Sequence, residues 1–530
     1  MTLPYVTSRA TRRNCFSLLL LLALSVPASA QVATGTPTFG SFAGGPDIMD
    51  LANLNAHITI PVLHKPGRGG MNFAYDLNYD STVWGPVGAS GSQSWIPASN
   101  WGWQVLGQYA GVLSNSVQGS VCTINGHNYH GVTIYYNWHY WDRFGINHLF
   151  PNAQTYMYTS PCGSGTTSDQ QNASDGSGFQ LNAQGRSGYV LSSAGANLAS
   201  ALATDRNGNQ ISVNSVTGAF TDTLGKTVLT MSGNAPSPVT FTYTAPSGGN
   251  AVITVQYQSY AVQTNFHCSG ITEYGTNGTT TANLISEIDL PEYNSTTNPS
   301  ARYLLAYEAT PGKSGFYTGR IASITLPTGG TISYAYSGGG SGVNGISCAD
   351  GSAATLVRTT PDGVWTYAQT KGTGAASTTT FTDPANNQTA IQFQGIYETE
   401  RQMYQGSTSG TLEQTIWTCY NGSTTPCNSA GVSLPINQRT VTQQYGTSGL
   451  EYRQNYFYSS NGGLTEEDDY DYGSGAPGSL WSAPRIRRVD HTKFAFGKSV
   501  LCGAASGGVV ARSATEPAEA ARCRAYSAGV

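Results

Sequence analysis

Alternating residues interrupted by tight turns constrain the fold of this chain more than any other feature. Residues 318–339 read TGRIASITLPTGGTISYAYSGG, with apolar and polar residues alternating on both sides of residues 327–330. Successive side chains of a strand point to opposite faces of a sheet, so this alternation predicts strands with one buried face. Pro and Gly at the centre favour a tight turn. The stretch therefore predicts a β-hairpin.

The same unit recurs elsewhere in the chain. Turns led by Asp205, Asp222 and Asp383 contain Gly or Asn and are each followed by an alternating, strand-like stretch. Asp favours such positions because its carboxylate accepts hydrogen bonds from the backbone of its own turn. Irregular recurrence of one hairpin type predicts a degenerate repeat that builds a sheet.

Composition supports the same fold class. Charged residues make up 10% of the 530 residues, and the chain contains 64 Gly and 32 Tyr. An average soluble protein has about 25% charged residues. Aromatic and β-branched residues fit pleated surfaces, whereas runs of Glu, Lys and Leu with helical spacing are nearly absent after the first thirty residues. The exported part of the chain is predicted to be all-β.

The first thirty residues form the pattern of a secretory signal peptide. Arg9, Arg12 and Arg13 precede an apolar run over residues 17–26, and small residues lead to a cleavage site near Ala30. That apolar run is too short to span a membrane, and no later stretch is apolar enough to do so. We expect a secreted or bacterial cell-envelope protein that does not span the membrane.

Cysteine usage agrees with export. Apart from Cys15, eight cysteines remain, and no C-x-x-C pair suggests zinc. Cys419 and Cys427 lie close enough to pair across a local loop. Two longer pairs are compatible with the sequence, although spacing does not fix the connectivity: Cys122 with Cys162 and Cys268 with Cys348. Disulfides are therefore expected in preference to a metal site.

Charge is distributed unevenly. Residues 31–478 carry 14 basic and 26 acidic side chains, a net charge of −12, whereas residues 479–530 carry 8 basic and 3 acidic, a net charge of +5. A mildly acidic, Tyr-rich body gives no reason to expect nucleic acid as a partner.

Two groups of residues have side chains suited to ligand binding. His64, Lys65 and Arg68 bring positive charge to a Pro- and Gly-containing loop that suits a phosphate or a sugar acid. Solvation of an exposed turn is the favoured interpretation. His127, His130, His139 and His148 are close in sequence to Asp142 and suit Zn²⁺ or Cu²⁺. Packing among aromatic strand residues is the favoured interpretation for these histidines.

Carboxylates give two further hypotheses. The acidic run Glu466, Glu467, Asp468 and Asp469, followed by Asp471, suits Ca²⁺, but it lacks the spacing of a known calcium loop, and a solvated edge strand is favoured. Carboxylate pairs for sugar hydrolysis are also conceivable, although most Asp residues begin turns. We therefore assign no catalytic, cofactor-binding or metal-binding residue from the sequence.

Several strings resemble a known family. ATDRNGNQISV, FTDTLGKTVL, RIASITLPTGGTISYAY and TTTFTDPANNQTAIQF resemble the repeats of bacterial RHS/YD-repeat proteins. The segments FGSFAGGPDIMDLANLNAHITIPVLHKPGRG and YDLNYDSTVW look like the N-terminal part of secreted members, and WDRFGINHLF and GLTEEDDYDYGSGAPG are also similar. The resemblance covers roughly residues 35–478. It implies a large, spirally wound β-sheet shell, which often ends in a variable and sometimes toxic module.

The chain departs from that family pattern in two ways. It has only a handful of repeats, too few for a full shell, and it lacks the D-P-x-G-L signature that precedes a toxin module. We expect a signal peptide over residues 1–30, an N-terminal β domain over 31–200, degenerate YD-like hairpins forming a partial curled sheet over 201–478, and a poorly ordered or aberrant tail over 479–530. The tail suggests a truncated or frame-altered member.

The expected function is a non-enzymatic scaffold for surface presentation. Surplus Tyr and Trp can stack on sugar faces, so glycans or other cell-surface components are the expected partners. A secreted carbohydrate-active enzyme with paired carboxylates is the first alternative, and a fragment of a toxin-encapsulating shell is the second. The sequence does not indicate an oligomeric state.

Overall fold

A computed structural model describes residues 33–104, 110–199, 202–278, 280–340 and 342–478. These residues form thirty-six strands and three short 3₁₀ helices, and they contain no α-helix. The expected all-β class is confirmed. The expected signal peptide and the tail at 479–530 lie outside the described residues. No helix in the described ranges has the length and apolar character needed to cross a membrane.

Twenty-three strands form one antiparallel sheet in which each strand pairs with the next one along the chain, apart from β23, which the sheet omits. The expected domain boundary at 200 and 201 falls between two paired strands of this sheet, β16 and β17. The strands are β13 (Ser168–Asn172), β14 (Gln180–Gln184), β15 (Ser187–Leu191), β16 (Asn197–Ala199), β17 (Leu202–Thr204), β18 (Gln210–Asn214), β19 (Ala219–Asp222), β20 (Thr227–Ser232), β21 (Val239–Thr244), β22 (Asn250–Ala261), β24 (Thr281–Asp289), β25 (Arg302–Ala309), β26 (Tyr317–Thr325), β27 (Thr331–Ser337), β28 (Thr355–Thr360), β29 (Gly363–Lys371), β30 (Ala376–Thr382), β31 (Gln388–Gln394), β32 (Tyr397–Gln405), β33 (Thr411–Tyr420), β34 (Gln438–Tyr445), β35 (Leu450–Tyr458) and β36 (Leu464–Ser474).

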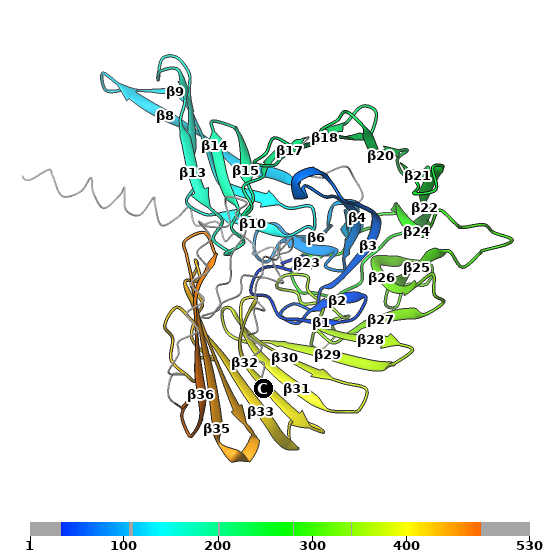
Figure 1. The fold of residues 1–530 in the computed structure, drawn as a ribbon, viewed down its shortest axis with the longest axis vertical. Coiled ribbons are helices and arrows are strands. Elements are labelled where there is room, and N and C mark those ends of the chain that lie inside the picture. Colours follow the sequence, from blue (N-terminus) through cyan, green and yellow to red (C-terminus); the bar gives the residue numbers. More distant parts are fainter. Residues whose placement is uncertain (1–32, 105–109, 200–201, 279, 341, 479–530) are drawn as a thin grey trace, which may run out of the picture.

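The large sheet curves around the N-terminal strands, as Figure 1 shows. Three smaller sheets complete the fold: one of β1, β2, β3, β4 and β7, one of β5, β6 and β23, and one of β8 to β12. Their strands are β1 (Phe42–Gly44), β2 (Asp47–Asp50), β3 (Ala56–Lys65), β4 (Phe73–Asp80), β5 (Trp84–Val87), β6 (Gln93–Pro97), β7 (Trp103–Gln104), β8 (Val112–Ile124), β9 (His127–Trp141), β10 (Asn147–Phe150), β11 (Thr155–Tyr158), β12 (Gly165–Thr166) and β23 (Ile271–Thr272). The 3₁₀ helices are η1 (Arg68–Gly70), η2 (Ser99–Gly102) and η3 (Gly446–Ser448).

The hairpin expected at residues 318–339 is confirmed. β26 and β27 pair through Thr325 and Thr331, and Ile324 lies opposite Ile332. Ile324 and Ile332 are buried, as the alternation requires. Two further hairpins are formed by β3 with β4 and by β9 with β10.

The core lies between the N-terminal strands and the concave face of the large sheet. One buried cluster joins Ile58 and Ile60 of β3 to sheet residues such as Ile324 and Ile391. Tyr75 of β4 contacts the ring of Phe241 of β21 at a centroid distance of 5.3 Å. This cluster reaches from β17 to β31 of the large sheet. Because the apolar faces of those strands need a covering layer, the N-terminal segment, strands β1 to β7, acts as the inner support of that part of the curled sheet.

Buried polar contacts join the same two parts. The Asp47 carboxylate accepts hydrogen bonds from Arg358 on β28 at 2.5 and 2.7 Å and from the Tyr334 hydroxyl at 2.8 Å. The Trp84 indole donates to the carbonyl of Thr318 at 2.8 Å. These contacts pair polar groups that would be costly to bury alone.

The recurring turns share one hydrogen-bond pattern. In the turns that begin at Asp205, Asp222 and Asp383, the backbone N–H of the Asp donates to the carbonyl of the fifth turn residue. In each case that fifth residue donates its own N–H back to the Asp carboxylate. Asp142 begins a turn of the same kind. The role expected for these Asp residues, capping the local backbone, is confirmed.

The two ends of the large sheet meet at turns instead of pairing as strands. A Cβ on Gly462, in the turn before β36, would lie 2.0 Å from the carbonyl oxygen of Gly176, in the turn after β13. Gly462 has a φ of +77°, which only glycine adopts readily. Phe39 of the N-terminal segment packs edge-on against Tyr458 at the end of β35, with ring centroids 5.1 Å apart. The curled sheet thus nearly closes on itself.

Disulfides are present as expected, and they join the three cysteine pairs that the sequence allowed. They join Cys122 to Cys162, Cys268 to Cys348 and Cys419 to Cys427.

Candidate functional site

A long hairpin projects from the rim of the molecule. Its strands are β8 and β9, with β11 beside β9 and β12 beside β11, and Figure 1 shows its tip extending well beyond the curled sheet. We call residues 114–136 and 155–166 the finger. The aromatic character of β9 was expected from the sequence, but the projection was not.

One face of the finger is rich in tyrosine. Strand register places Ile134 opposite Tyr156 and Val132 opposite Tyr158, so these four side chains share a face. The rings of Tyr156 and Tyr158 are nearly parallel, with centroids 6.2 Å apart. Tyr136 lies on the same face and is 38% exposed. This surface offers flat apolar rings with hydroxyl groups at their edges.

The finger carries no fixed charge. Residues 114–136 and 155–166 contain no Asp, Glu, Lys or Arg. On the tyrosine face, the strand neighbours of Tyr136, Ile134 and Val132 are Ser116, Gln118 and Ser120 of β8. Hydroxyl and amide groups without charge suit neutral, hydrogen-bonding ligands and give no attraction to polyanions.

A disulfide holds the outer part of the finger together. Cys122 on β8 bonds to Cys162, which follows β11. Gly131 of β9 allows the close approach, because a Cβ there would lie 2.9 Å from the Cys162 sulfur. The surface is therefore held in shape before any ligand arrives, which reduces the entropy lost on binding.

A buried histidine anchors the base of the finger. His148 on β10 donates from Nδ1 to Asp175 at 2.6 Å, and its Nε2 lies 3.5 Å from Asp142. Its ring packs against Tyr140 of β9 and Phe179 of the large sheet's first turn. Burial opposes charge on His148, but its hydrogen bonds and proximity to Asp142 and Asp175 outweigh burial and raise its pKa to about 9.

This anchor predicts a loss of stability at alkaline pH. Since the folded-state pKa of His148 lies above its ordinary 6.5, its stabilisation is complete below pH 6.5 and is lost as the pH rises through 9. We expect the advantage of wild type over His148→Gln in free energy of unfolding to shrink by about 2–3 kcal/mol between about pH 6 and pH 10. Urea denaturation at both pH values measures it.

The control is His64→Gln. His64 also contacts a carboxylate, that of Asp76 at 2.6 Å, but its side chain is 59% exposed. The Asp76 side chain is 6% exposed, but solvent screens the exposed His64 imidazole, so the effect of His64→Gln on stability should change less with pH than that of His148→Gln. A wild-type advantage over His148→Gln that is the same at both pH values would contradict the anchoring role.

The four histidines that are close in sequence do not lie together in the structure. His127 and His130 are exposed near the finger tip, His139 contacts Asn147, and His148 is buried at the base. Across the described ranges, no group of three or more His, Cys, Asp or Glu side chains is arranged to hold a metal ion.

The acidic run lies on β36, the last strand of the large sheet. Its residues follow one another along one strand, so they alternate between the two faces and do not gather at one point. Asp469 accepts hydrogen bonds from Tyr452 and Gln454 of β35. The placement matches the favoured interpretation of a charged edge strand.

One carboxylate pair shows opposed pKa shifts. Burial and its contact with Glu287 raise the pKa of Asp289 to about 6, while the pKa of Glu287 is lowered. The two carboxyl groups share a hydrogen bond, and Glu287 also pairs with Arg302 at 2.6 Å. Gln256 donates a hydrogen bond to Asp289 at 3.2 Å, so both carboxylates take part in contacts within the sheet.

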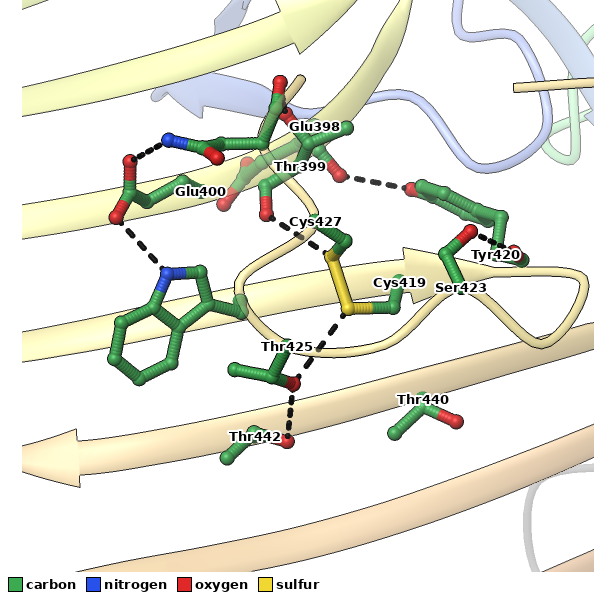
Figure 2. The surroundings of a disulfide bond; sticks show 12 residues. Glu398, Thr399, Glu400, Cys419, Tyr420, Ser423, Thr425, Cys427, Thr440 and Thr442 are labelled. Carbon is green, nitrogen blue, oxygen red and sulfur yellow. Dashed lines mark hydrogen bonds between the residues drawn. A yellow bond between two sulfur atoms is a disulfide. The ribbon is translucent and has the colours of Figure 1, made fainter. Parts of the chain in front are cut away.

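A second carboxylate pair flanks the Cys419–Cys427 disulfide, as Figure 2 shows. Glu398 lies opposite Phe393 and Glu400 lies opposite Gln392, with a bulge between them, so the two carboxylates face different sides of the sheet. Glu400 accepts from the Trp417 indole at 2.9 Å and from Asn428 at 3.1 Å. Both groups are thus held in structural contacts on opposite sides of the sheet.

The cationic loop lies at the tip of the β3–β4 hairpin. His64 is paired with Asp76, whereas Lys65 and Arg68 line a pocket formed with β18 and the turn after β19. The sequence indicated the loop but not the opposite wall, because those residues are more than 130 positions away.

Neither a scan of protein-family models nor a search of curated proteins gives a match to this chain.

The finger contains residues that the sequence did not single out. Tyr156 and Tyr158 belong to β11, and their position beside β9 depends on pairing across an intervening hairpin. The alternation of TYMY was the available signal, but four residues do not specify a partner strand.

Proposed function

We propose that this protein is an exported, non-enzymatic scaffold of the RHS/YD-repeat kind that presents its finger to neutral glycans at a cell surface. The recurring Asp-led turns and the single curled sheet support the repeat assignment. Three disulfides support an oxidising location outside the cytoplasm.

The observation that carries the proposal is the uncharged tyrosine face. Sugar rings present C–H faces that pack on aromatic rings and hydroxyl groups that bond to polar neighbours. Tyr136, Tyr156 and Tyr158 provide the rings, and Gln118 provides an amide on the neighbouring strand. The absence of fixed charge on the finger favours neutral over acidic sugars.

Glycan binding should depend on the paired rings. With the full chain on a glycan array, we expect a neutral oligosaccharide to bind, and we expect Tyr156→Ala with Tyr158→Ala to weaken that binding at least tenfold. Loss of two stacking contacts of about 1 kcal/mol each gives a loss of roughly 30-fold. Isothermal titration with the best array ligand measures the change.

A matched control uses another tyrosine pair. Tyr445 and Tyr472 near the end of the large sheet are also exposed, with ring centroids 6.0 Å apart. Their double alanine variant should bind as wild type does. Failure of every neutral glycan to bind, or an equal loss in the control, would remove the glycan assignment. Release of reducing ends from a polysaccharide would favour the enzyme alternative instead.

A further inference from the structure

A shallow pocket that opens to solvent lies between the β3–β4 tip and the rim of the large sheet. Lys65 and Arg68 form one wall, and Gln210 and Leu224 belong to the opposite side. Asp222 also lines the pocket, but its carboxylate is bonded to the backbone of its own turn. The lining thus combines two cations, an amide, an apolar side chain and this internally bonded carboxylate.

The cationic wall is held in a fixed place. Asn72 accepts a hydrogen bond from the backbone N–H of Gly67 at 3.1 Å, and the N–H of Met71 donates to the carbonyl of Arg68 at 3.0 Å. Gly69 has a φ of +61°, and a Cβ there would lie 2.7 Å from the side chain of Asn209. Glycine at this position lets the loop dock against the opposite turn.

The two cations lack anionic partners. Neither Lys65 nor Arg68 forms an ion pair with another residue of the described ranges. The nearby carboxylates are engaged elsewhere: Asp205 accepts from the N–H of Asn207 and Asn209, and Asp222 accepts from two N–H groups of its own turn. An anion from outside the chain would complete the site.

We propose that this pocket binds the carboxylate of a sugar acid, such as a hexuronic acid residue of a polysaccharide. Lys65 and Arg68 bind the carboxylate, Gln210 bonds to ring hydroxyls, and Leu224, which is 56% exposed, packs on the sugar face. The apolar part of the lining favours an organic anion over inorganic phosphate. This site is independent of the finger, since the two share no residue.

Titration of the full chain with glucuronate, galacturonate, glucose and inorganic phosphate at low salt tests the proposal. We expect millimolar or tighter binding of a uronate, at least tenfold stronger than that of glucose or phosphate. Lys65→Gln with Arg68→Gln should weaken uronate binding at least tenfold. Added salt should weaken binding to wild type, because the contact is between charges.

The control removes two positive charges from the neighbouring turns. Arg206→Gln with Lys226→Gln makes the same change in net charge but leaves Lys65 and Arg68 in place. Its uronate affinity should stay within about twofold of wild type, and thermal melting verifies that both double variants fold. No uronate binding at about 10 mM, equal binding of phosphate, or an equal loss in the control would overturn the proposal. None of these outcomes depends on whether the finger binds neutral glycans.

Discussion

Replacing Asp47 by alanine is expected to lower the free energy of unfolding by about 3–5 kcal/mol. Asp47 is fully buried on β2 and holds both the Arg358 guanidinium and the Tyr334 hydroxyl. Its removal leaves the Arg358 side chain, itself 5% exposed, as a buried charge without its carboxylate. The N-terminal segment and the large sheet would then lose their central polar link.

Urea denaturation followed by tryptophan fluorescence measures this loss. The matched control is Lys371→Ala, which removes a cation paired with Asp350 at 3.2 Å and 37% exposed. A partly exposed pair contributes about 0–1 kcal/mol, so this variant should remain close to wild type. Equal losses of unfolding free energy in the two variants would show that the buried link between the N-terminal segment and the large sheet has no special role.

Removal of the Cys268–Cys348 disulfide is expected to lower the free energy of unfolding by an amount similar to that of Asp47→Ala. The bond closes a loop of 80 residues, and loop-closure entropy of the unfolded chain gives about 4.5 kcal/mol for that length. The bond between Cys419 and Cys427 closes only 8 residues, which gives about 2.5 kcal/mol. Cys268 is also buried against the main core, so its substitution removes packing as well.

Paired Cys→Ser variants of each bond, compared by denaturation under non-reducing conditions, test this order. We expect the 268–348 variant to be the least stable, the 122–162 variant to be intermediate, and the 419–427 variant to be nearest to wild type. Equal losses of unfolding free energy in the three variants, or the reverse order of losses, would show that loop length does not govern the stabilisation by these disulfides.

Local features of the fold could be predicted from the sequence because their causes are local. Asp205 and Asp222 bond within their own turns, and alternation around Ile324 and Ile332 sets which face is buried. These signals act over a few residues, so they specify hairpins without a knowledge of the rest of the chain.

The position of the N-terminal segment could not be predicted in this way. Asp47 and Arg358 are separated by 311 positions, and no feature of the sequence around either residue identifies the other as its contact partner. The near closure of the sheet depends likewise on the contact between Gly176 and Gly462. The chain contains 64 glycines, and nothing in the sequence distinguishes these two from the others. Long-range pairing reflects the summed twist of many strands, which no single stretch encodes.

The candidate sites could likewise be predicted from the sequence only in part. The sequence marked the aromatic strand that became β9 and the cationic residues Lys65 and Arg68. It did not place Tyr156 beside β9 or Gln210 opposite the cationic loop, because both neighbours come from other elements. A binding surface built from two elements can be predicted only when both elements are known to lie side by side.

The central claim is that the N-terminal segment is the inner support of one curled sheet. Hydrogen exchange measured by mass spectrometry tests it most directly, in wild type and Asp47→Ala. We predict that amides of β3 exchange as slowly as those of β28 in wild type and that both speed up together in the variant. Fast exchange of β3 beside a protected β28 in wild type would contradict the account.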